Sequence, residues 1–100
     1  MVTKIRDIIP GMRNLIVEGI VLEKSSSRLV ETRFGSAVVA TAVLKDETGS
    51  ITLNLWRGQV DQVKEGDAIR VLNAFAKSFG SRTELSIGQD GRIQVIYRAG

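Results

Sequence analysis

Trp56 is the only tryptophan in the chain, and it ends a run at residues 51–56 that alternates in polarity. Successive side chains of a β-strand point to opposite faces. Trp56 therefore lies on the polar face, next to Arg57, while three aliphatic residues share the inward face: Ile51, Leu53 and Leu55. An exposed indole beside a cation is suited to stacking on a nucleic-acid base. The alternative is that the indole folds under a loop at the end of the strand.

A second group of aromatic and basic residues begins after Ala68. Ile69 and Val71 have one parity, and continuing that parity would bury Lys77, which is implausible for an unpaired ammonium group. We therefore predict a bulge or sharp bend near Asn73 that reverses the pattern. A helical alternative is disfavoured because the run is short and flanked by predicted strands. Its apolar stripe would comprise Leu72, Phe75, Ala76 and Phe79.

The predicted outward face combines rings and cations from three segments. Its members are Trp56, Phe75, Phe79, Lys77 and Arg82. Every base has a π-face, and each stacked base is worth roughly 1–3 kcal/mol on alanine substitution. Cations between the rings would contact the phosphates. This combination of residue types favours binding of single-stranded nucleic acid.

The composition limits the other kinds of chemistry. The 100 residues carry a net charge of +3, which permits a polyanionic partner without requiring one. The chain contains no Cys and no His, the residues most used for thiolate or imidazole metal sites and for acid–base catalysis near neutral pH. Asp46 and Glu47 form a carboxylate pair at a predicted hairpin corner with no partner cluster, so we interpret them as part of a solvated turn and not as a metal site. We expect no enzymatic activity, no catalytic residue, no metal and no cofactor.

The pattern of strands and turns predicts an all-β OB-fold, a five-stranded Greek-key barrel with a short helix between the third and fourth strands. Strands are expected at residues 15–22, 37–44, 51–56, from 68, and at 83–87. A loop is expected from Ser25 to Phe34 or Gly35, the helix at 57–64, and a turn at Asp90-Gly91 before residues 93–97. A small SH3-like barrel lacks that helix. Residues 1–100 are expected to form a single domain.

Several ordered segments resemble the archaeal-type single-stranded DNA-binding proteins. The segments are Leu53-Asn54-Leu55-Trp56, Val63-Lys64-Glu65-Gly66-Asp67 and Asn73-Ala74-Phe75, with Ile9-Pro10-Gly11-Met12-Arg13-Asn14 and Asp46-Glu47-Thr48-Gly49 in support. That family has one OB-fold related to replication protein A, and the human SOSS-complex single-stranded DNA-binding subunit is similar. The resemblance covers nearly the whole chain.

The resemblance implies sequence-tolerant binding and protection of single-stranded DNA in replication, recombination or repair. Bases would stack on Trp56, Phe75 and Phe79, although the family often has Trp at position 75. Val30 would pack against the bases. Arg28 and Arg33, in the first long loop, would contact phosphates unless they belong only to a solvated basic loop. Further contacts are expected from Arg57, Lys77 and Arg82.

Further expectations concern location, oligomeric state and partners. The chain lacks a long apolar run and a signal peptide, so we expect a cytoplasmic protein that binds no membrane. We also expect a monomer, and the resemblance to DNA-binding proteins implies association with the nucleoid. Family members often carry a flexible C-terminal tail that recruits repair or replication proteins. This sequence ends at Tyr97-Arg98-Ala99-Gly100, so either the tail has been removed or that function is lacking. A protein-interaction OB module and an RNA-binding OB domain are the alternative functions.

Overall fold

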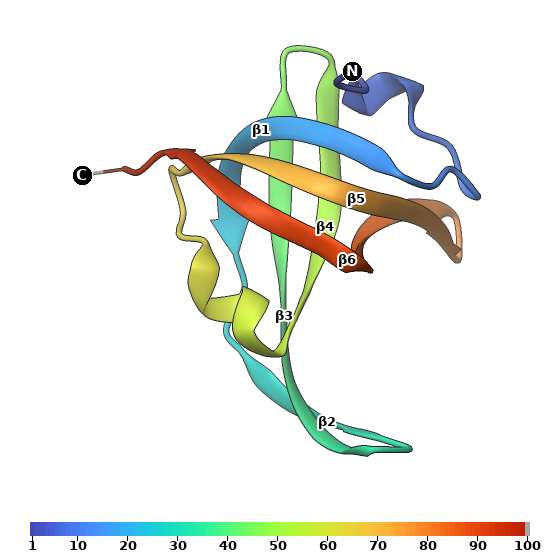
Figure 1. Cartoon of the computed structure of the whole chain (residues 1–100), viewed down its shortest axis with the longest axis vertical. Helices are drawn as coiled ribbons and strands as arrows, with labels where there is room; N and C mark the ends of the chain where they lie inside the picture. The colour runs from blue at the N-terminus through green and yellow to red at the C-terminus, as the bar shows by residue number, and fades with distance from the viewer. Residues whose placement is uncertain (100) are drawn as a thin grey trace.

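The computed structural model describes residues 1–99, which form six strands and two short 3-10 helices (Figure 1). The elements in chain order are η1 (Ile5–Asp7), β1 (Leu15–Lys24), β2 (Arg28–Thr32), β3 (Gly35–Asp46), β4 (Gly49–Trp56), η2 (Arg57–Gln62), β5 (Ala68–Phe79) and β6 (Arg82–Tyr97). Among these residues, no helix has the length and apolar character needed to span a bilayer.

Five of the strands close into a barrel. β1 pairs with β3 and with β5, β5 pairs with β6, and β4 joins β6 to β3, so the pairing returns to β1. All of these pairings are antiparallel except the one between β4 and β6, where Thr52 lies beside Glu84 and Leu53 beside Leu85. This strand order, with η2 between β4 and β5, is the order predicted for an OB-fold.

β2 is a sixth strand at a position where the sequence analysis predicted only a loop, so that prediction was wrong. Residues Arg28–Thr32 pair antiparallel with the first part of β3, from Thr32 beside Gly35 to Arg28 beside Val39. β2 has no second neighbour in the sheet, and it contains no fully buried residue. A strand paired on one side, without a buried face, lacks the alternation that identifies strands in sequence. The β2–β3 hairpin projects beyond the barrel as a finger (Figure 1).

β6 is a single strand, so the predicted turn at Asp90-Gly91 was also wrong. The strand pairs with β5 on both sides of this segment, from Leu72 beside Arg92 to Ala74 beside Ile87. Residues 88–91 therefore lie opposite Asn73, where they interrupt the regular pairing between β5 and β6. Glycine and aspartate suit a bulge as well as a turn, which is why the local composition was misleading.

Asn73 lies at the bulge predicted in the fourth barrel strand. Its φ is +57°, a left-handed conformation that asparagine tolerates better than most residues. Before the bulge Ile69 and Val71 are buried, and after it Ala74 and Ala76 are buried. The reversal of parity in the strand interpretation is confirmed, and the helical alternative was wrong. The bulge turns the next three odd-numbered side chains of β5 outward.

Candidate nucleic-acid interface

A groove of about 540 Å³ crosses the outer face of the sheet between the finger and β5. β2 supplies one wall, β3 and β4 the floor, and β5 and β6 the opposite side. The groove brings together six of the residues that the sequence analysis selected: Arg28, Val30, Trp56, Phe75, Lys77 and Phe79. These residues are separated by up to half the length of the chain, and only the barrel topology brings them together.

Trp56 forms part of a row that runs across three strands. Its neighbour in β3 is Val39, and the neighbour of Val39 in β2 is Arg28. With adjacent strands about 4.8 Å apart, the Arg28 and Trp56 backbones lie about 10 Å from each other. Trp56 is 39% exposed and lines the groove, so no loop covers it. Its exposed surface is available for stacking, and Arg28 lies two strands away in the same row.

β5 contributes two rings and one cation to the opposite side of the groove. Phe75 is half-buried, whereas Phe79 is 46% exposed. The Lys77 Nζ atom lies 5.7 Å from the centroid of the Phe79 ring, which is a cation–π distance. This ammonium group can neutralise a phosphate close to a base that stacks on either ring.

The other three predicted cations lie outside the groove. Arg33 is at the tip of the finger, with its guanidinium carbon 5.9 Å from the centroid of the Phe34 ring. Arg57 has a φ of +55°, which turns the chain directly after Trp56, and Arg57 lines a separate hollow near η2. Arg82 pairs with Glu84, with its Nη2 atom 3.2 Å from Glu84 Oε2.

η2 is held against the end of β4 by polar contacts. Gln59 Oε1 accepts a hydrogen bond of 2.9 Å from the Trp56 backbone nitrogen. The Lys24 ammonium group donates to the backbone oxygens of Val60 and Val63. A cation on the last carbonyls of a short helix is favourable because these groups have no partner within the helix. These contacts fix where β4 ends and therefore fix the backbone position of Trp56.

Sequence reasoning missed two polar residues that line the groove. Asn54 lies on the same face of β4 as Trp56, and Ser86 lies beside Phe75 in the β5–β6 ladder. Both residues occupy positions whose side chains point outward from their strands, so strand alternation could have identified them. Phe34 was also missed as an exposed ring: it is 87% exposed at the finger tip, outside the groove.

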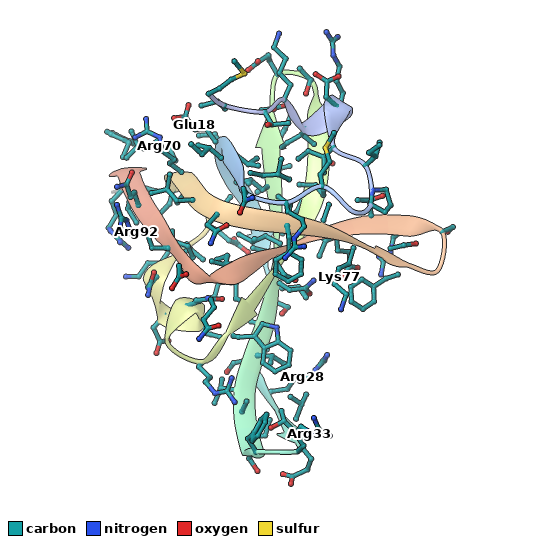
Figure 2. The ribbon with its side chains drawn as sticks, turned by 45° about the vertical axis from the view of Figure 1, so that its right-hand side comes forward. Glu18, Arg28, Arg33, Arg70, Lys77 and Arg92 are labelled. Atoms are coloured by element: carbon teal, nitrogen blue, oxygen red, sulfur yellow. The ribbon has the colours of Figure 1, made fainter. Side chains whose placement is uncertain are left out.

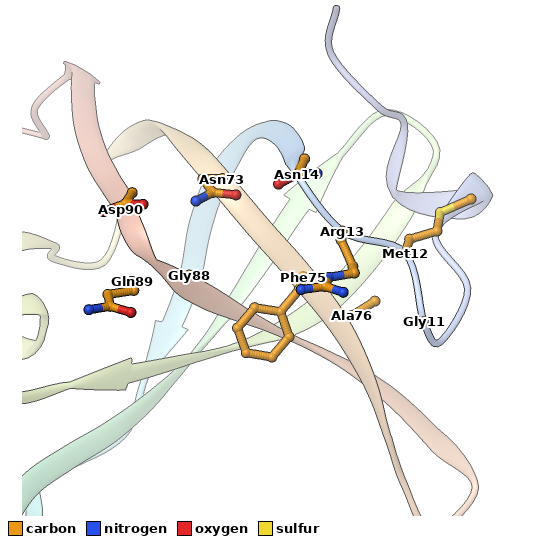
Figure 3. A pocket seen from close by; sticks show the side chains of 10 residues that line it. All are labelled: Gly11, Met12, Arg13, Asn14, Asn73, Phe75, Ala76, Gly88, Gln89 and Asp90. Atoms are coloured by element: carbon orange, nitrogen blue, oxygen red, sulfur yellow. The ribbon is translucent and has the colours of Figure 1, made fainter.

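A second hollow of about 490 Å³ continues beyond Phe75 (Figure 3). Phe75 lines both cavities, so they adjoin at this ring. The second hollow is lined mainly by the turn before β1 and by the bulge, including Arg13, Asn14, Asn73 and Gln89. Arg13 is a cation that the sequence analysis did not select, because it lies in a turn without strand periodicity.

Cations are distributed unevenly around the groove. Figure 2 shows Arg28 and Arg33 on the finger and Lys77 near the middle of the sheet, whereas Arg70 lies at the far end, where it pairs with Glu18.

Two carboxyl groups have displaced pKa values, and both lie outside the groove. Burial alone would raise the pKa of Asp46 and of Asp67. Asp46 accepts hydrogen bonds from Thr48, Ile5 and Gly49, and Asp67 accepts them from Lys64 and Ala99. These hydrogen bonds outweigh burial, so each pKa lies below its ordinary value.

Known proteins share this sequence pattern and this architecture. The family model described as single-stranded DNA binding protein Ssb-like, OB fold, matches residues 12–95. The chain belongs to this family. Membership confirms the OB-fold and the archaeal-type resemblance. It also agrees with the expectation of a binding domain rather than an enzyme.

Two curated relatives and one solved structure illustrate the similarity. The single-stranded DNA binding protein Ssb of Saccharolobus solfataricus is 31% identical over 93% of this chain and 63% of its own length. Replication factor A of Methanothermobacter thermautotrophicus is 35% identical over 77% of this chain but only 10% of its own length. The chain thus spans less than two thirds of either relative. The second OB-fold domain of replication protein A from Methanococcus maripaludis superposes with a TM-score of 0.81 at 26% identity, covering 100% of this chain and 99% of that one.

Proposed function

We propose that this protein binds single-stranded DNA with little sequence preference and protects it during replication, recombination or repair. The observation that carries the proposal is the groove in which Trp56, Phe75 and Phe79 share one surface with Arg28 and Lys77. Exposed rings supply stacking to any base, and the cations supply attraction to the backbone. The family and the names of its relatives support the same class of ligand.

In this mechanism the strand lies across the sheet, from the finger toward the bulge. Bases stack on the rings while Val30 packs against them from β2. Arg28 and Lys77 meet the phosphates from opposite sides of the groove. Arg33, Arg57 and Arg82 do not line the groove, so we expect at most one of them to contact the strand, at a point where it leaves the groove.

A duplex cannot use the rings in this way, because its bases are already paired and stacked. The test is therefore a comparison of end-labelled oligo-dT with a duplex of the same length, by fluorescence anisotropy at fixed salt. Tighter binding of the single strand is expected. Equal or tighter binding of the duplex would reject stacking as the basis of recognition, and equal binding of oligo-U would extend the ligand class to single-stranded RNA.

A further inference from the structure

The side-chain amide of Asn54 is held in one orientation on the floor of the groove. Its Nδ2 atom donates to Glu84 Oε1 at 3.0 Å and to the Leu85 backbone oxygen at 3.4 Å. A carboxylate and a carbonyl can only accept hydrogen bonds. Turning the amide over would bring Oδ1 against two oxygens, so the chemistry of its neighbours fixes the orientation of the amide.

The Asn54 Oδ1 atom is consequently an acceptor without a protein partner. Within residues 1–99, no side chain or backbone group donates a hydrogen bond to it, and no buried side-chain nitrogen or oxygen in that range is left unpaired. Asn54 is only half-buried and lines the groove. Oδ1 is therefore open to solvent, at the place where the proposed ligand lies.

Asn54 lies between the stacking rings. Trp56 is two residues further along the same face of β4. On the other side, Asn54 reaches β6 through its bond to Glu84, and Ser86, the next outward residue of β6, is paired with Phe75. A base that stacks on Trp56 or Phe75 can therefore bring its polar edge within reach of Oδ1.

Glu84 keeps the acceptor in place and adds negative charge behind it. The residue is only 7% exposed, and its two oxygens are occupied by Asn54 and by Arg82. A buried carboxylate next to the amide polarises it, which strengthens Oδ1 as an acceptor. The same negative charge disfavours a base edge rich in carbonyl oxygens.

We propose that Asn54 is a base-selecting acceptor, positioned by Glu84, that favours cytosine over thymine at one position of the bound strand. The inference rests on the proposed binding of single-stranded DNA. Cytosine presents an exocyclic amino group as a donor, whereas thymine presents a carbonyl oxygen at the same position. The result is a modest local preference superimposed on binding that is otherwise insensitive to sequence.

The experiment is a positional scan. One cytosine replaces one thymine at each position of a fixed-length oligo-dT in turn, and the dissociation constant is measured for each oligonucleotide. The wild-type protein is expected to bind about 2- to 10-fold more tightly when the cytosine occupies one position, which is the range for a single hydrogen bond. The oligonucleotide must be short enough to hold the strand in one register.

Two variants separate the acceptor from the residue that positions it. Asn54→Leu keeps a similar shape without the acceptor, and we expect it to bind oligo-dT while losing the cytosine preference. Glu84→Gln replaces one of the two obligate acceptors with an amide that can itself donate to Asn54, so only the Leu85 carbonyl still opposes the turned orientation. The preference should then shrink, while affinity for oligo-dT rises because a negative charge has been removed. Thr52→Val, on the same face of β4 but outside the groove, is the matched control and should retain the preference.

A flat scan with the wild-type protein, or a cytosine preference that survives in Asn54→Leu, would overturn the inference. If Asn54→Leu does not fold, the wild-type scan and Glu84→Gln still test the inference. A cytosine preference that is unchanged in Glu84→Gln would also overturn it. Failure of the wild-type protein to bind any of the oligonucleotides would instead reject the proposed function. The two failures are therefore distinguishable.

Discussion

The backbone oxygen of Asn73 lies 2.8 Å from the point that a Cβ atom on Gly88 would occupy. The two strands approach closely here because residues 88–91 of β6 fold around the bulge opposite Asn73. The bulge reverses the parity of β5 and so directs Phe75 into the groove. A side chain at position 88 would force the strands apart at the point that controls this reversal.

Gly88→Ala should therefore destabilise the protein and weaken binding together. Overpacking costs typically 1–3 kcal/mol, and displacement of β5 moves Phe75 away from the groove. Thermal melts and oligo-dT titrations measure the two effects. Gly58→Ala is the control, because no atom lies within 4 Å of its added Cβ. A Gly88→Ala variant with wild-type stability would show that the strands can separate at no cost.

Stacking on the indole should quench the emission of Trp56, the only tryptophan. Titration with oligo-dT is expected to lower the emission in proportion to the bound fraction. Trp56→Ala should lose roughly 1–3 kcal/mol of binding free energy, because the stacked base loses its platform. Emission that stays constant at saturation, with binding shown by anisotropy, would contradict stacking at this position.

The two phenylalanines of β5 should differ in their effect on stability. Each alanine substitution is expected to weaken binding by roughly 1–3 kcal/mol. Phe79→Ala should leave the melting temperature nearly unchanged, since Phe79 is exposed, whereas Phe75→Ala should lower it because Phe75 is half-buried. Phe34→Ala removes an exposed ring outside the groove and serves as the control. Equal losses of affinity in Phe34→Ala and Phe79→Ala would place the strand elsewhere.

Binding should weaken with salt in proportion to the phosphate contacts. Arg28 and Lys77 line the groove, and one cation outside it brings the total to three at most. At about 0.7 per contact on a single strand, the log–log slope should lie between about −1.4 and −2.1. Affinity should then fall about 7- to 18-fold between 50 and 200 mM salt.

Single substitutions should show which residues contribute to the salt dependence of binding. Arg28→Ala should reduce the magnitude of the log–log slope by about 0.7, while Trp56→Ala should leave it unchanged, because stacking releases no counterions. Lys4→Ala, an exposed cation near the N-terminus, should have no effect. A slope that is identical in Arg28→Ala and the wild-type protein would remove Arg28 from the set of phosphate contacts.

The parts of this structure that could be predicted from sequence are those with a buried face. Alternation at residues 51–56 predicted the outward position of Trp56, and the conflict between Val71 and Lys77 predicted the bulge at Asn73. In each case, burying the wrong face would be energetically costly, so the pattern allows only one arrangement.

The parts that could not be predicted lack such a constraint. β2 buries neither face, so its pairing with β3 leaves no periodic signal. The positions of Arg57 and Arg82 depend on a left-handed residue and on an ion pair with Glu84, and neither follows from strand parity. Asn54 had the correct parity, but the role that we propose for it depends on Glu84, which is 30 residues away in the chain.

Asp67 should make the protein sensitive to acid. It is fully buried directly before β5, where it accepts hydrogen bonds from the backbone nitrogens of Lys64 at 2.9 Å and Ala99 at 3.1 Å, and Arg98 Nη1 lies 3.4 Å away. Burial alone would raise the pKa of Asp67, but these partners outweigh burial and lower it. A lowered pKa means that the folded state favours the ionised group, so this stabilisation is present above the ordinary carboxyl pKa of about 4 and is lost as the pH falls further.

Urea denaturation of Asp67→Asn at pH 7 and at pH 3 measures this contribution. The substitution should lower the free energy of unfolding at pH 7. The difference from the wild-type protein should narrow at pH 3, which lies below the ordinary carboxyl pKa, because the unfolded wild-type chain then takes up a proton at Asp67 more readily than the folded one. Part of the acid sensitivity should remain, because the pKa of Asp46 is lowered in the same direction. Asp61→Asn is the matched control. Because Asp61 is exposed, this substitution should not alter the free energy of unfolding at either pH. A constant difference between Asp67→Asn and the wild-type protein across this range would show that Asp67 stabilises the β5 end through its shape and hydrogen bonds rather than through its charge.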